Sequence, residues 1–371
     1  MRLWILLSRF EKGGLERVQA NLAPTFVEHG LEVTIAAGIF TNGTKATLPS
    51  SLQIIEIGNS GKILFIFNLF RALRNSKPDA IITTSNDLAC LVLLARKFLY
   101  PKTAVICTQH LAIDAQLKIS KGINRLKHQL IIYLMQKTWP KADAIIAVSS
   151  GLSEDIRRTI KLKSSIETIP NPVVMPNFNN KIHQRIHWPW PDTLMPTFIF
   201  VGRLAQVKRL DLLLNSFIAV RKAMPCRLII LGDGPDKRYV NDFVNINNLH
   251  AVCHLAGHQD NPLPWIARSD TLVLSSDYEG FGNVLVEAMA CGTQVISTNC
   301  QYGPAEILDN GRYGQLIPTN DMTSLIYAMF RALSKEFFVD PAILAKRADD
   351  FNLRKASEAY LNVIFKAVRK S

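Results

Sequence analysis

The sequence predicts an α/β fold made of two doubly wound parallel sheets. Short apolar runs alternate with helix-length amphipathic stretches in both halves of the chain. The runs are nearly continuous in apolar residues, as expected for parallel strands that helices cover on both faces. A proline-rich segment separates the two series at 170–197. The 371 residues also suffice for two domains of roughly 150 residues each.

The first series of strands lies in a predicted N-terminal domain, 1–172. We expect its strands at 2–8, 31–37, 53–57, 79–85, 103–109 and 143–149. We expect the first run to be a strand rather than a signal peptide, because charges interrupt its apolar core from Leu3 to Leu7 and no small-residue cleavage site follows. The apolar runs 63–70 and 130–135 fall well short of the roughly 20 residues that a membrane span needs.

The second series lies in a predicted C-terminal domain, 197–350, after a linker at 173–196. We expect its strands at 197–202, 226–232, 251–257, 270–276, 293–298 and 313–318. The last stretch, 351–371, predicts an amphipathic helix that packs back on the N-terminal domain, and its apolar face holds Leu361, Ile364, Phe365 and Val368. Two such domains leave a cleft at the carboxyl ends of their strands, where ligands bind.

The composition narrows the class of partner. The hydrophobic content of 48% is typical of a globular protein, whereas the net charge of +13 favours an anionic partner: nucleic acid, a membrane surface or an anionic substrate. The six cysteines lie mostly in apolar runs without zinc-like spacing, which predicts buried, reduced thiols and a cytoplasmic protein.

Glycine-rich or basic turns after predicted strands are candidate anion sites. Gly13 and Gly14 follow the first strand and open a helix, although a plain tight turn is as good an explanation. Arg203 and Lys208 follow strand 197–202 and suit a diphosphate; the alternative is a solvated basic turn, since Arg209 adjoins them.

Two weaker candidates follow the next strands of the second series. Asp233 lies at a strand–helix junction, where a capping or turn role is the better explanation. Gly257 ends another strand, and the backbone there can flank a planar base, although a single glycine is a weak signal.

The segment 277–292, DYEGFGNVLVEAMACG, places two acids at the start of a helix. Strand 270–276 leads into this turn, and Gly292 ends the predicted helix. Glu279 is expected at the rim of the positively polarised helix N-terminus and Glu287 on the helix flank. Carboxylates accept hydrogen bonds from hydroxyls, so the pair suits the sugar and ribose of a nucleotide sugar. The alternative is a turn residue and a surface acid.

EGFGNVLVEAMACG resembles the E-x7-E signature of the retaining glycosyltransferases of family 4 (glycosyltransferases group 1). That family has the GT-B fold, in which two Rossmann-like domains face each other across a cleft. Further segments resemble the family's motifs in order and spacing: KGGLERV, AIIAVSSGL, IPNPV, FVGRLAQVKRLDLLLNSF, LIILGDGPDK and CQYGPAEILDNGRYGQLIP. The last is similar to enzymes that extend lipid-linked or polysaccharide glycans with hexose or N-acetylhexosamine units.

The resemblance implies roles for residues of the second domain. Arg203 and Lys208 would neutralise the donor diphosphate, Glu287 would bind the ribose hydroxyls, and Glu279 would bind those of the donor sugar. The backbone that would line the sugar and phosphate belongs to Phe281, Gly282, Asn283 and Val284.

The resemblance also implies contacts elsewhere. Gly257 and His258 would border the base, Gly14 would approach the diphosphate, and His110 would contact the donor sugar near its reacting carbon. On its own, a histidine at a strand end is more often structural. Many relatives have proline at the position of Gly282.

No metal ion or other cofactor is expected. The sequence has no convincing Asp-x-Asp, and the two cations with the helix dipole can stabilise the leaving diphosphate. The resemblance implies retention of anomeric configuration by a front-face displacement.

The stretch 111–143 interleaves cations with apolar residues, which favours contact with an anionic membrane surface; a solvated helix with one buried face is the alternative. Together with the net charge of +13, this stretch predicts a polyprenyl-diphosphate-linked glycan acceptor and a peripheral protein on the inner face of the cell membrane. The expected donor is a nucleotide-diphosphate sugar, with a UDP-sugar favoured.

Other classes fit less well. A nucleotide-sugar epimerase of GT-B fold needs acid and base residues around the sugar that are not evident. A non-catalytic nucleic-acid binder would explain the charge, but few aromatics accompany the cations, so no nucleic-acid partner is expected. A non-catalytic membrane-binding protein is a further alternative.

Overall fold

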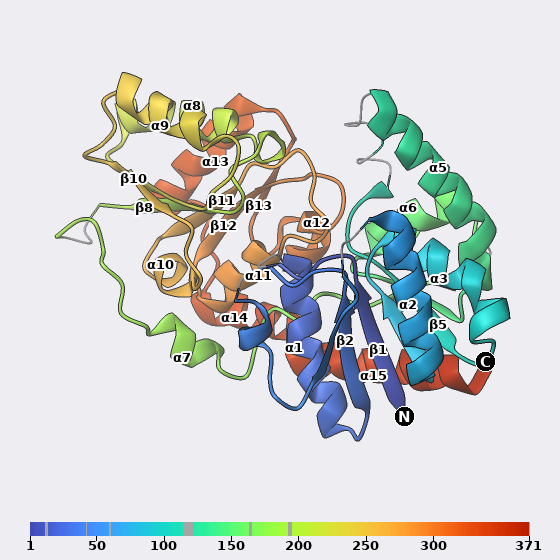
Figure 1. Cartoon of the computed structure of the whole chain (residues 1–371). Helices are drawn as coiled ribbons and strands as arrows, with labels where there is room; N and C mark the ends of the chain where they lie inside the picture. The colour runs from blue at the N-terminus through green and yellow to red at the C-terminus, as the bar shows by residue number, and fades with distance from the viewer. Residues whose placement is uncertain are drawn as a thin grey trace. The chain divides into compact units, whose positions relative to one another are not determined.

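The computed structural model describes residues 1–11, 14–41, 43–58, 61–113, 117, 122–162, 165–191 and 195–370. The chain divides into two compact units (Figure 1). The first comprises Met1–Pro172 and Leu353–Ser371, and the second comprises Val173–Asn352.

The first unit contains a parallel sheet, in which seven strands are described. Their order is β3-β2-β1-β4-β5-β6-β7. The strands are β1 (Arg2–Leu7), β2 (Glu32–Ala37), β3 (Gln53–Glu56), β4 (Ala80–Thr83), β5 (Ala104–Gln109), β6 (Ala144–Ala147) and β7 (Glu167–Thr168). All six strands predicted in this half are confirmed, within one or two residues at each end. The two-residue β7 is too short to give a sequence pattern.

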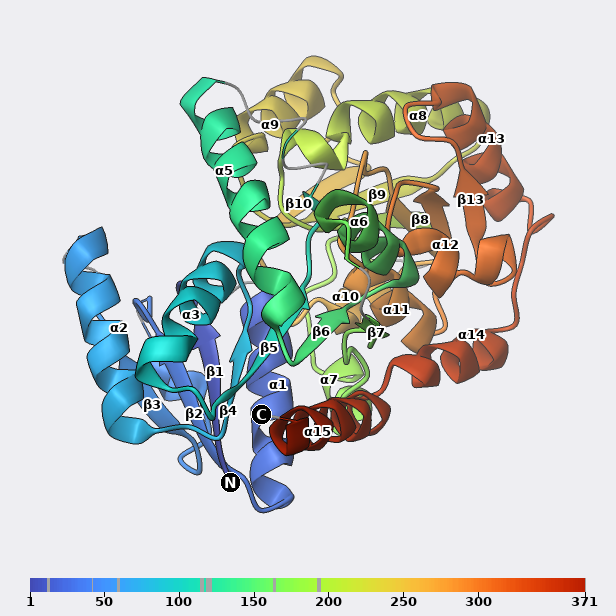
Figure 2. The ribbon, with the colours of Figure 1, turned by 90° about the vertical axis from the view of Figure 1, so that its right-hand side faces the viewer.

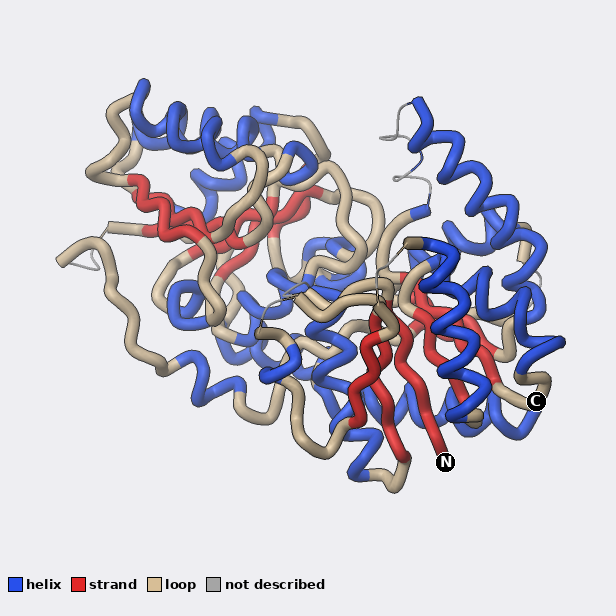
Figure 3. The backbone as a smooth tube through the Cα atoms, in the orientation of Figure 1, coloured by secondary structure: helices blue, strands red, loops and turns tan. Residues whose placement is uncertain are grey.

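Helices cover both faces of this sheet (Figures 2 and 3). They are α1 (Gly14–Glu28), α2 (Lys62–Ser76), α3 (Asn86–Leu99), α5 (Gly122–Thr138), α6 (Ser150–Ile160) and α15 (Leu353–Lys370), with short 3₁₀ turns at Lys45–Thr47 and Trp139–Lys141. α1 packs against α15, whereas α3 packs against α5 and α5 against α6. Right-handed crossovers run in opposite directions from β1 and from β3, which places α1 on one face and α2, α3 and α5 on the other.

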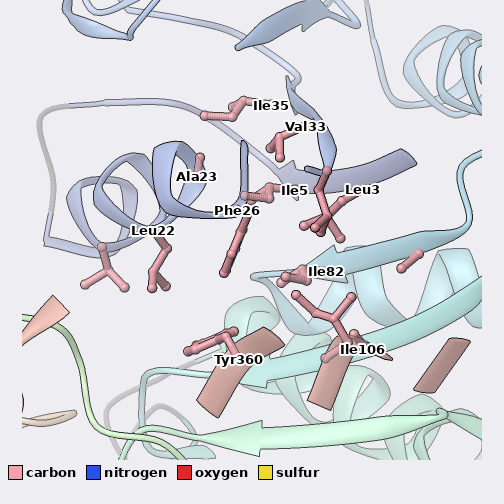
Figure 4. Packing of buried hydrophobic residues seen from close by; sticks show 14 of the residues in the cluster. Leu3, Ile5, Leu22, Ala23, Phe26, Val33, Ile35, Ile82, Ile106 and Tyr360 are labelled. Carbon is pink, nitrogen blue, oxygen red and sulfur yellow. The ribbon is translucent and has the colours of Figure 1, made fainter. Parts of the chain in front are cut away.

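The core of the first unit joins the two ends of the chain. Phe26 of α1 and Tyr360 of α15 lie with ring centroids 6.3 Å apart and pack over the apolar side chains of the sheet (Figure 4). Leu361 and Ile364 of the predicted apolar face are buried, but Phe365 is 41% exposed. The predicted apolar face was too wide, because the contact with the sheet covers a narrower stripe.

The second unit contains a parallel sheet of six described strands. Their order is β10-β9-β8-β11-β12-β13. The strands are β8 (Thr197–Val201), β9 (Arg227–Leu231), β10 (Cys253–Gly257), β11 (Thr271–Leu274), β12 (Gln294–Thr298) and β13 (Gln315–Ile317). Each corresponds to a predicted strand.

Helices flank this sheet as well. They are α7 (Phe178–Ile182), α8 (Leu210–Ala223), α9 (Lys237–Ile246), α10 (Leu263–Ala267), α11 (Asn283–Ala290), α12 (Pro304–Ile307), α13 (Met322–Leu333) and α14 (Pro341–Ala348), with 3₁₀ turns at Gln206–Lys208, Asp309–Gly311 and Asp349–Phe351. α8 packs against α13, while α11 packs against α10 and α14.

The proline-rich segment 173–196 belongs to the second unit rather than standing apart as a linker. Trp188 is buried with its ring 5.9 Å from that of Trp265. Trp190 donates through Nε1 to the carbonyl of Ala251 at 2.9 Å, and the Arg227 guanidinium lies 4.7 Å from its ring. Two tryptophans, each followed by a proline, therefore fix this segment on the sheet edge.

The predictions that the cysteines are buried thiols and that no apolar run spans a membrane can be compared with the structure. The six cysteines are free thiols, and all except the half-buried Cys291 are buried. Of the helices in the described ranges, none is both long enough and apolar enough to cross a membrane.

Candidate functional site

The strand order places a ligand-binding position in the second unit. The order β10-β9-β8-β11-β12-β13 reverses direction between β8 and β11. In open parallel sheets, ligands bind outside the carboxyl ends of the strands at such a switch point. The turn after β8 carries Arg203 and Lys208, and the turn after β11 carries Glu279. The residues singled out from the sequence therefore flank the switch point.

The structure brings Lys208 and Glu279 together. The Lys208 Nζ lies 2.5 Å from Oε1 of Glu279, and both side chains are largely buried. The same carboxylate oxygen accepts a hydrogen bond from the hydroxyl of Ser276 at 2.6 Å. Ser276 is fully buried at the end of β11, so its hydroxyl fixes the direction of the carboxylate. Charge-assisted contacts of this kind are about twice as strong as neutral hydrogen bonds.

The two turns are also joined through their backbones. The amide of Asp277 donates to the carbonyl of Val207 at 2.9 Å. The hydroxyl of Ser275 donates to the carbonyl of Lys208 at 2.8 Å. These contacts keep the basic turn and the acidic turn at a fixed separation, independently of the ion pair.

Arg209 stabilises the same junction. Its guanidinium donates to both carboxylate oxygens of Asp211 and lies 3.2 Å from Asp277. The hydrogen bonds that Arg209 donates to Asp211 raise the pKa of Arg209 and lower the pKa of Asp211. Arg209 has a left-handed backbone conformation, with φ of 49°, which sets its side chain apart from that of Lys208. The basic turn thus contains one structural cation.

Arg203 differs from its neighbours. It is exposed, and among the described residues it forms no ion pair. An exposed guanidinium at the switch point can bind a phosphate group with two hydrogen bonds. Lys208 adds a second positive charge to this position.

The helix after Glu279 begins in a turn that requires glycine. Gly282 precedes α11 with φ of +99° and provides no capping side chain. The amide groups at Asn283 and Val284, in the first turn of α11, therefore give this end the positive polarity that attracts anions. Proline, with φ near −65°, cannot adopt the conformation of Gly282, so this turn excludes proline at that position.

The turn is held from behind by close packing. Phe281 is buried and its ring meets that of Phe351 edge-on at 5.6 Å. A Cβ atom on Gly303 would lie 1.7 Å from the carbonyl oxygen of Phe281, so only glycine allows this approach. Glu287 is half-buried on α11, four residues after Asn283, or about 6 Å along the helix.

The candidate base-binding residues lie at the end of β10. The carbonyl of Gly257 accepts from the amide of Gly232 at 2.8 Å, and Gly257 has φ of +67°. His258 is exposed, with Nε2 3.5 Å from Oδ1 of Asp260. Asp233, at the end of β9, accepts from the amide of Gly234 at 2.7 Å and pairs with Lys237. This confirms Asp233 as a turn acid.

In the first unit, His110 follows the carboxyl end of β5. Its Nε2 lies 3.1 Å from the hydroxyl of Thr108, and it is half-buried. Burial lowers the pKa of His110 to about 4, although a hydrogen bond with Asn171 acts in the opposite direction. The ring is therefore neutral near pH 7 and can serve as one donor and one acceptor. Gly14 begins α1 next to the end of β1, whereas Gly13 lies outside the described residues.

Sequence reasoning missed Ser275, Ser276 and the Arg209–Asp277 pair. Ser276 could have been recognised from its position three residues before Glu279, because a hydroxyl just after the strand can donate to that carboxylate. It also missed a hydroxyl pair at the switch point of the first sheet, where Ser8 and Ser85 lie 2.9 Å apart. Within the described ranges, no group of three His, Cys, Asp or Glu side chains is arranged to hold a metal ion.

Comparison with known proteins identifies the family. The model described as Glycosyltransferase Family 4 matches residues 12–175, and that described as Glycosyl transferases group 1 matches residues 195–335. A 4-α-N-acetylgalactosaminyltransferase of Campylobacter jejuni, named for an N-acetylgalactosamine-N,N'-diacetylbacillosaminyl-diphospho-undecaprenol, is 25% identical over 88% of this chain and 89% of its own. The uncharacterized glycosyltransferase MJ1059 of Methanocaldococcus jannaschii is 28% identical over 65% of this chain, and the match spans 61% of that protein.

Solved structures share the fold over nearly the whole chain. The apo form of the lipopolysaccharide outer core galactosyltransferase WaaB has a TM-score of 0.76 at 22% identity, covering 98% of this chain and 99% of its own. Anabaena Alr3699/HepE in complex with UDP has a TM-score of 0.76 at 16% identity, with the same coverage. The chain therefore belongs to the group 1, family 4 glycosyltransferases and has the GT-B fold of two Rossmann-like units.

Proposed function

We propose that the protein transfers a hexose or N-acetylhexosamine from a UDP-sugar to a polyprenyl-diphosphate-linked glycan, with retention of anomeric configuration. The product would serve cell-surface polysaccharide or glycoconjugate synthesis. The observation that carries the proposal is the Lys208–Glu279 pair at the switch point of the second sheet, 2.5 Å between Nζ and Oε1. This pair places a cation for a diphosphate directly beside an acceptor for sugar hydroxyls.

The donor would bind across this pair. Arg203, Lys208 and the amide end of α11 supply positive charge for the diphosphate, which gains negative charge as the glycosidic bond breaks. Glu279, held by Ser276, accepts hydrogen bonds from the donor sugar. Glu287 on α11 binds the ribose hydroxyls, and Gly257 with His258 borders the uracil. The UDP bound to Alr3699/HepE supports uridine as the nucleoside.

Retention would follow from a front-face displacement. The acceptor oxygen bonds to the anomeric carbon on the face from which the diphosphate leaves, the bond from this carbon to the diphosphate breaks, and a phosphate oxygen takes the acceptor proton. Glu279 already has Lys208 and Ser276 as partners, which favours a binding role over nucleophilic attack. From the first unit, His110 in its neutral form would donate to a sugar hydroxyl, and Gly14 would approach the diphosphate.

The acceptor would be presented at a membrane. The C. jejuni relative is named for a diphospho-undecaprenol acceptor. In this chain, α5 carries exposed Ile123, Leu126, Leu130 and Tyr133 together with Arg125 and Lys127. An amphipathic helix with basic residues binds anionic membrane surfaces. We therefore place the protein peripherally on the inner face of the cell membrane.

Assays with a panel of nucleotide sugars test this function. Purified protein is incubated with each donor, with and without a polyprenyl-diphosphate-linked glycan, and release of the nucleoside diphosphate is measured. We expect release that depends on the acceptor and a product whose anomeric configuration, assigned by NMR, matches the donor. An inverted product contradicts the mechanism. Recovery of an epimerised nucleotide sugar without transfer contradicts the proposed reaction.

A further inference from the structure

We propose that α2 is a second membrane-contacting helix, which forms with α5 one surface that binds an anionic lipid bilayer. We call it the α2/α5 surface and define it by Ile63, Leu64, Phe67, Ile123, Leu126, Leu130 and Tyr133. The inference rests on the proposed function in one respect, because a membrane-anchored acceptor gives such a surface its use.

The buried face of α2 fixes the rotation of the helix about its own axis. Leu69 and Leu73 are fully buried, and Asn68 donates through Nδ2 to the carbonyl of Ile57 at 3.2 Å. Phe65 packs close to Gly38, which follows β2. These contacts commit one side of α2 to the sheet, so the opposite side is presented outward.

The outward side of α2 begins with large apolar residues. Ile63 is 87% exposed and Phe67 is 61% exposed, and they lie one helical turn apart with Leu64 beside them. Arg71 and Arg74 are exposed on the turns that follow. Isolated apolar residues on a surface are ordinary, but a cluster of this size on one helix start indicates a binding surface.

Topology places this cluster and the exposed residues of α5 at one edge. α2 follows β3 and α5 follows β5, so both helices begin at the carboxyl ends of their parallel strands. Both also lie on the same face of the sheet, with α3 between them (Figures 1 and 2). His110 follows β5 at the same edge, so the bilayer would lie near the ligand-binding edge of this unit.

Charge selects the partner of the α2/α5 surface. Neither helix contains an Asp or Glu, whereas together they carry Lys62, Arg71, Arg74, Arg125, Lys127 and Lys137. The two arginines of α2 follow Phe67 by at least four residues, or about 6 Å along the axis. Apolar groups would thus reach the acyl boundary while the arginines meet lipid phosphates. A bilayer accommodates protruding side chains from two separate helices, which a second protein could match only with a complementary groove.

Vesicle binding of the full chain tests the inference. Sedimentation is measured with vesicles of phosphatidylcholine alone and with added phosphatidylglycerol. We expect binding to require phosphatidylglycerol, and the Ile63→Ser/Phe67→Ser variant to bind about tenfold more weakly or worse. Ile246→Ser/Phe338→Ser is the matched control, because these residues of the second unit are similarly exposed, at 78% and 55%. The control variant is expected to bind as the unmodified protein does.

Two results overturn the inference. One is equal vesicle binding by the α2 variant and the unmodified protein. The other is a dimer in light scattering that the α2 variant abolishes, since a second copy would then cover the surface. Transfer to a detergent-dispersed acceptor is measured in parallel. Lost vesicle binding with intact transfer supports the α2/α5 surface, whereas absent transfer with intact vesicle binding contradicts only the proposed function.

Discussion

Lys208 and Glu279 join the turns after two strands that are neighbours in the second sheet, with 2.5 Å between Nζ and Oε1. A donor that places its diphosphate on Lys208 and its sugar on Glu279 must share or replace this contact. The hydrogen bonds from the Asp277 amide and the Ser275 hydroxyl still join the two turns when the ion pair opens, so the side chains can exchange partners without movement of the turns. Under the proposed function, the pair is a preformed donor site rather than a structural bridge.

Replacing Glu279 by Gln should impair transfer more than binding of the nucleotide. The amide keeps the size of the side chain but loses the charge that strengthens hydrogen bonds to sugar hydroxyls. We expect kcat/KM for the UDP-sugar to fall about 10- to 100-fold, on the scale of hydrogen bonds to charged groups. Steady-state kinetics and calorimetry with UDP measure the two effects.

The matched control for this variant is Asp277→Asn, which alters the acid of the same turn that contacts Arg209 instead. It should lower stability without a comparable loss of kcat/KM. Unchanged turnover in the Glu279→Gln variant would contradict the assigned role of Glu279.

Replacing Ser276 by Ala should test its role as a positioning residue. The variant loses the 2.6 Å hydrogen bond to Glu279 and leaves the carboxylate free to rotate. We expect kcat/KM for the donor to fall about tenfold, while inhibition by UDP stays unchanged because the proposed function assigns Glu279 to the donor sugar rather than to the nucleotide. Ser297→Ala is the control, since Ser297 is equally buried on the neighbouring β12 and its hydroxyl donates to the carbonyl of Thr298. A parallel rise in the UDP inhibition constant would indicate general damage to the site instead.

Replacing Gly282 by Ala should weaken both the fold and donor binding. Its φ of +99° disfavours any side chain, and the added Cβ would lie 3.3 Å from Leu285. We expect a loss of about 1 to 2 kcal/mol in the free energy of unfolding, measured by urea denaturation. Gly311→Ala supplies the control, because Gly311 has φ of +100° with no atom close to the new Cβ. Only the Gly282 variant should bind UDP more weakly. Equal UDP affinity in the two variants would contradict the assignment of Gly282 to the donor site.

The strands and the strand-end positions of the site could be predicted because buried parallel strands are nearly continuous apolar runs. The contacts between the turns could not. The left-handed backbone at Arg209 directs its guanidinium to Asp211 and Asp277. The sequence shows only two adjacent cations, so it does not reveal that Arg209 is structural while Lys208 contacts Glu279. In the same way, prolines at 173–196 indicated a linker, whereas packing of Trp188 on Trp265 decided that the segment belongs to the second unit.

Metal removal should leave activity largely unchanged. In the proposed mechanism Arg203, Lys208 and the N-terminus of α11 provide the positive charge that stabilises the leaving diphosphate. Transfer is measured before and after treatment with EDTA, with Mg²⁺ restored in a third sample. Loss of transfer on EDTA treatment, reversed by Mg²⁺, would show that the cations of the protein do not suffice. Lys208→Ala should be strongly impaired with or without Mg²⁺.

His110 should make stability depend on pH in the weakly acidic range. Its pKa is about 4 in the fold against 6.5 for an unperturbed histidine, so the unfolded chain binds the proton first as pH falls. The free energy of unfolding is therefore expected to decrease from pH 6.5 toward pH 4, with His110 contributing about 1 to 2 kcal/mol of the loss between pH 7 and 5.

Urea denaturation of His110→Gln at pH 7 and pH 5 measures this contribution. The amide does not titrate, so the variant should lose less stability between the two pH values than the unmodified protein. His250→Gln, a change at an exposed position, provides the control and should retain the original pH dependence. An equal loss in all three proteins would mean that His110 is not the group that takes up the proton. Because the folded pKa is about 4, the ring stays neutral at pH 6.5, so titration of His110 should not lower transfer by the folded, unmodified protein between pH 7 and pH 6.5.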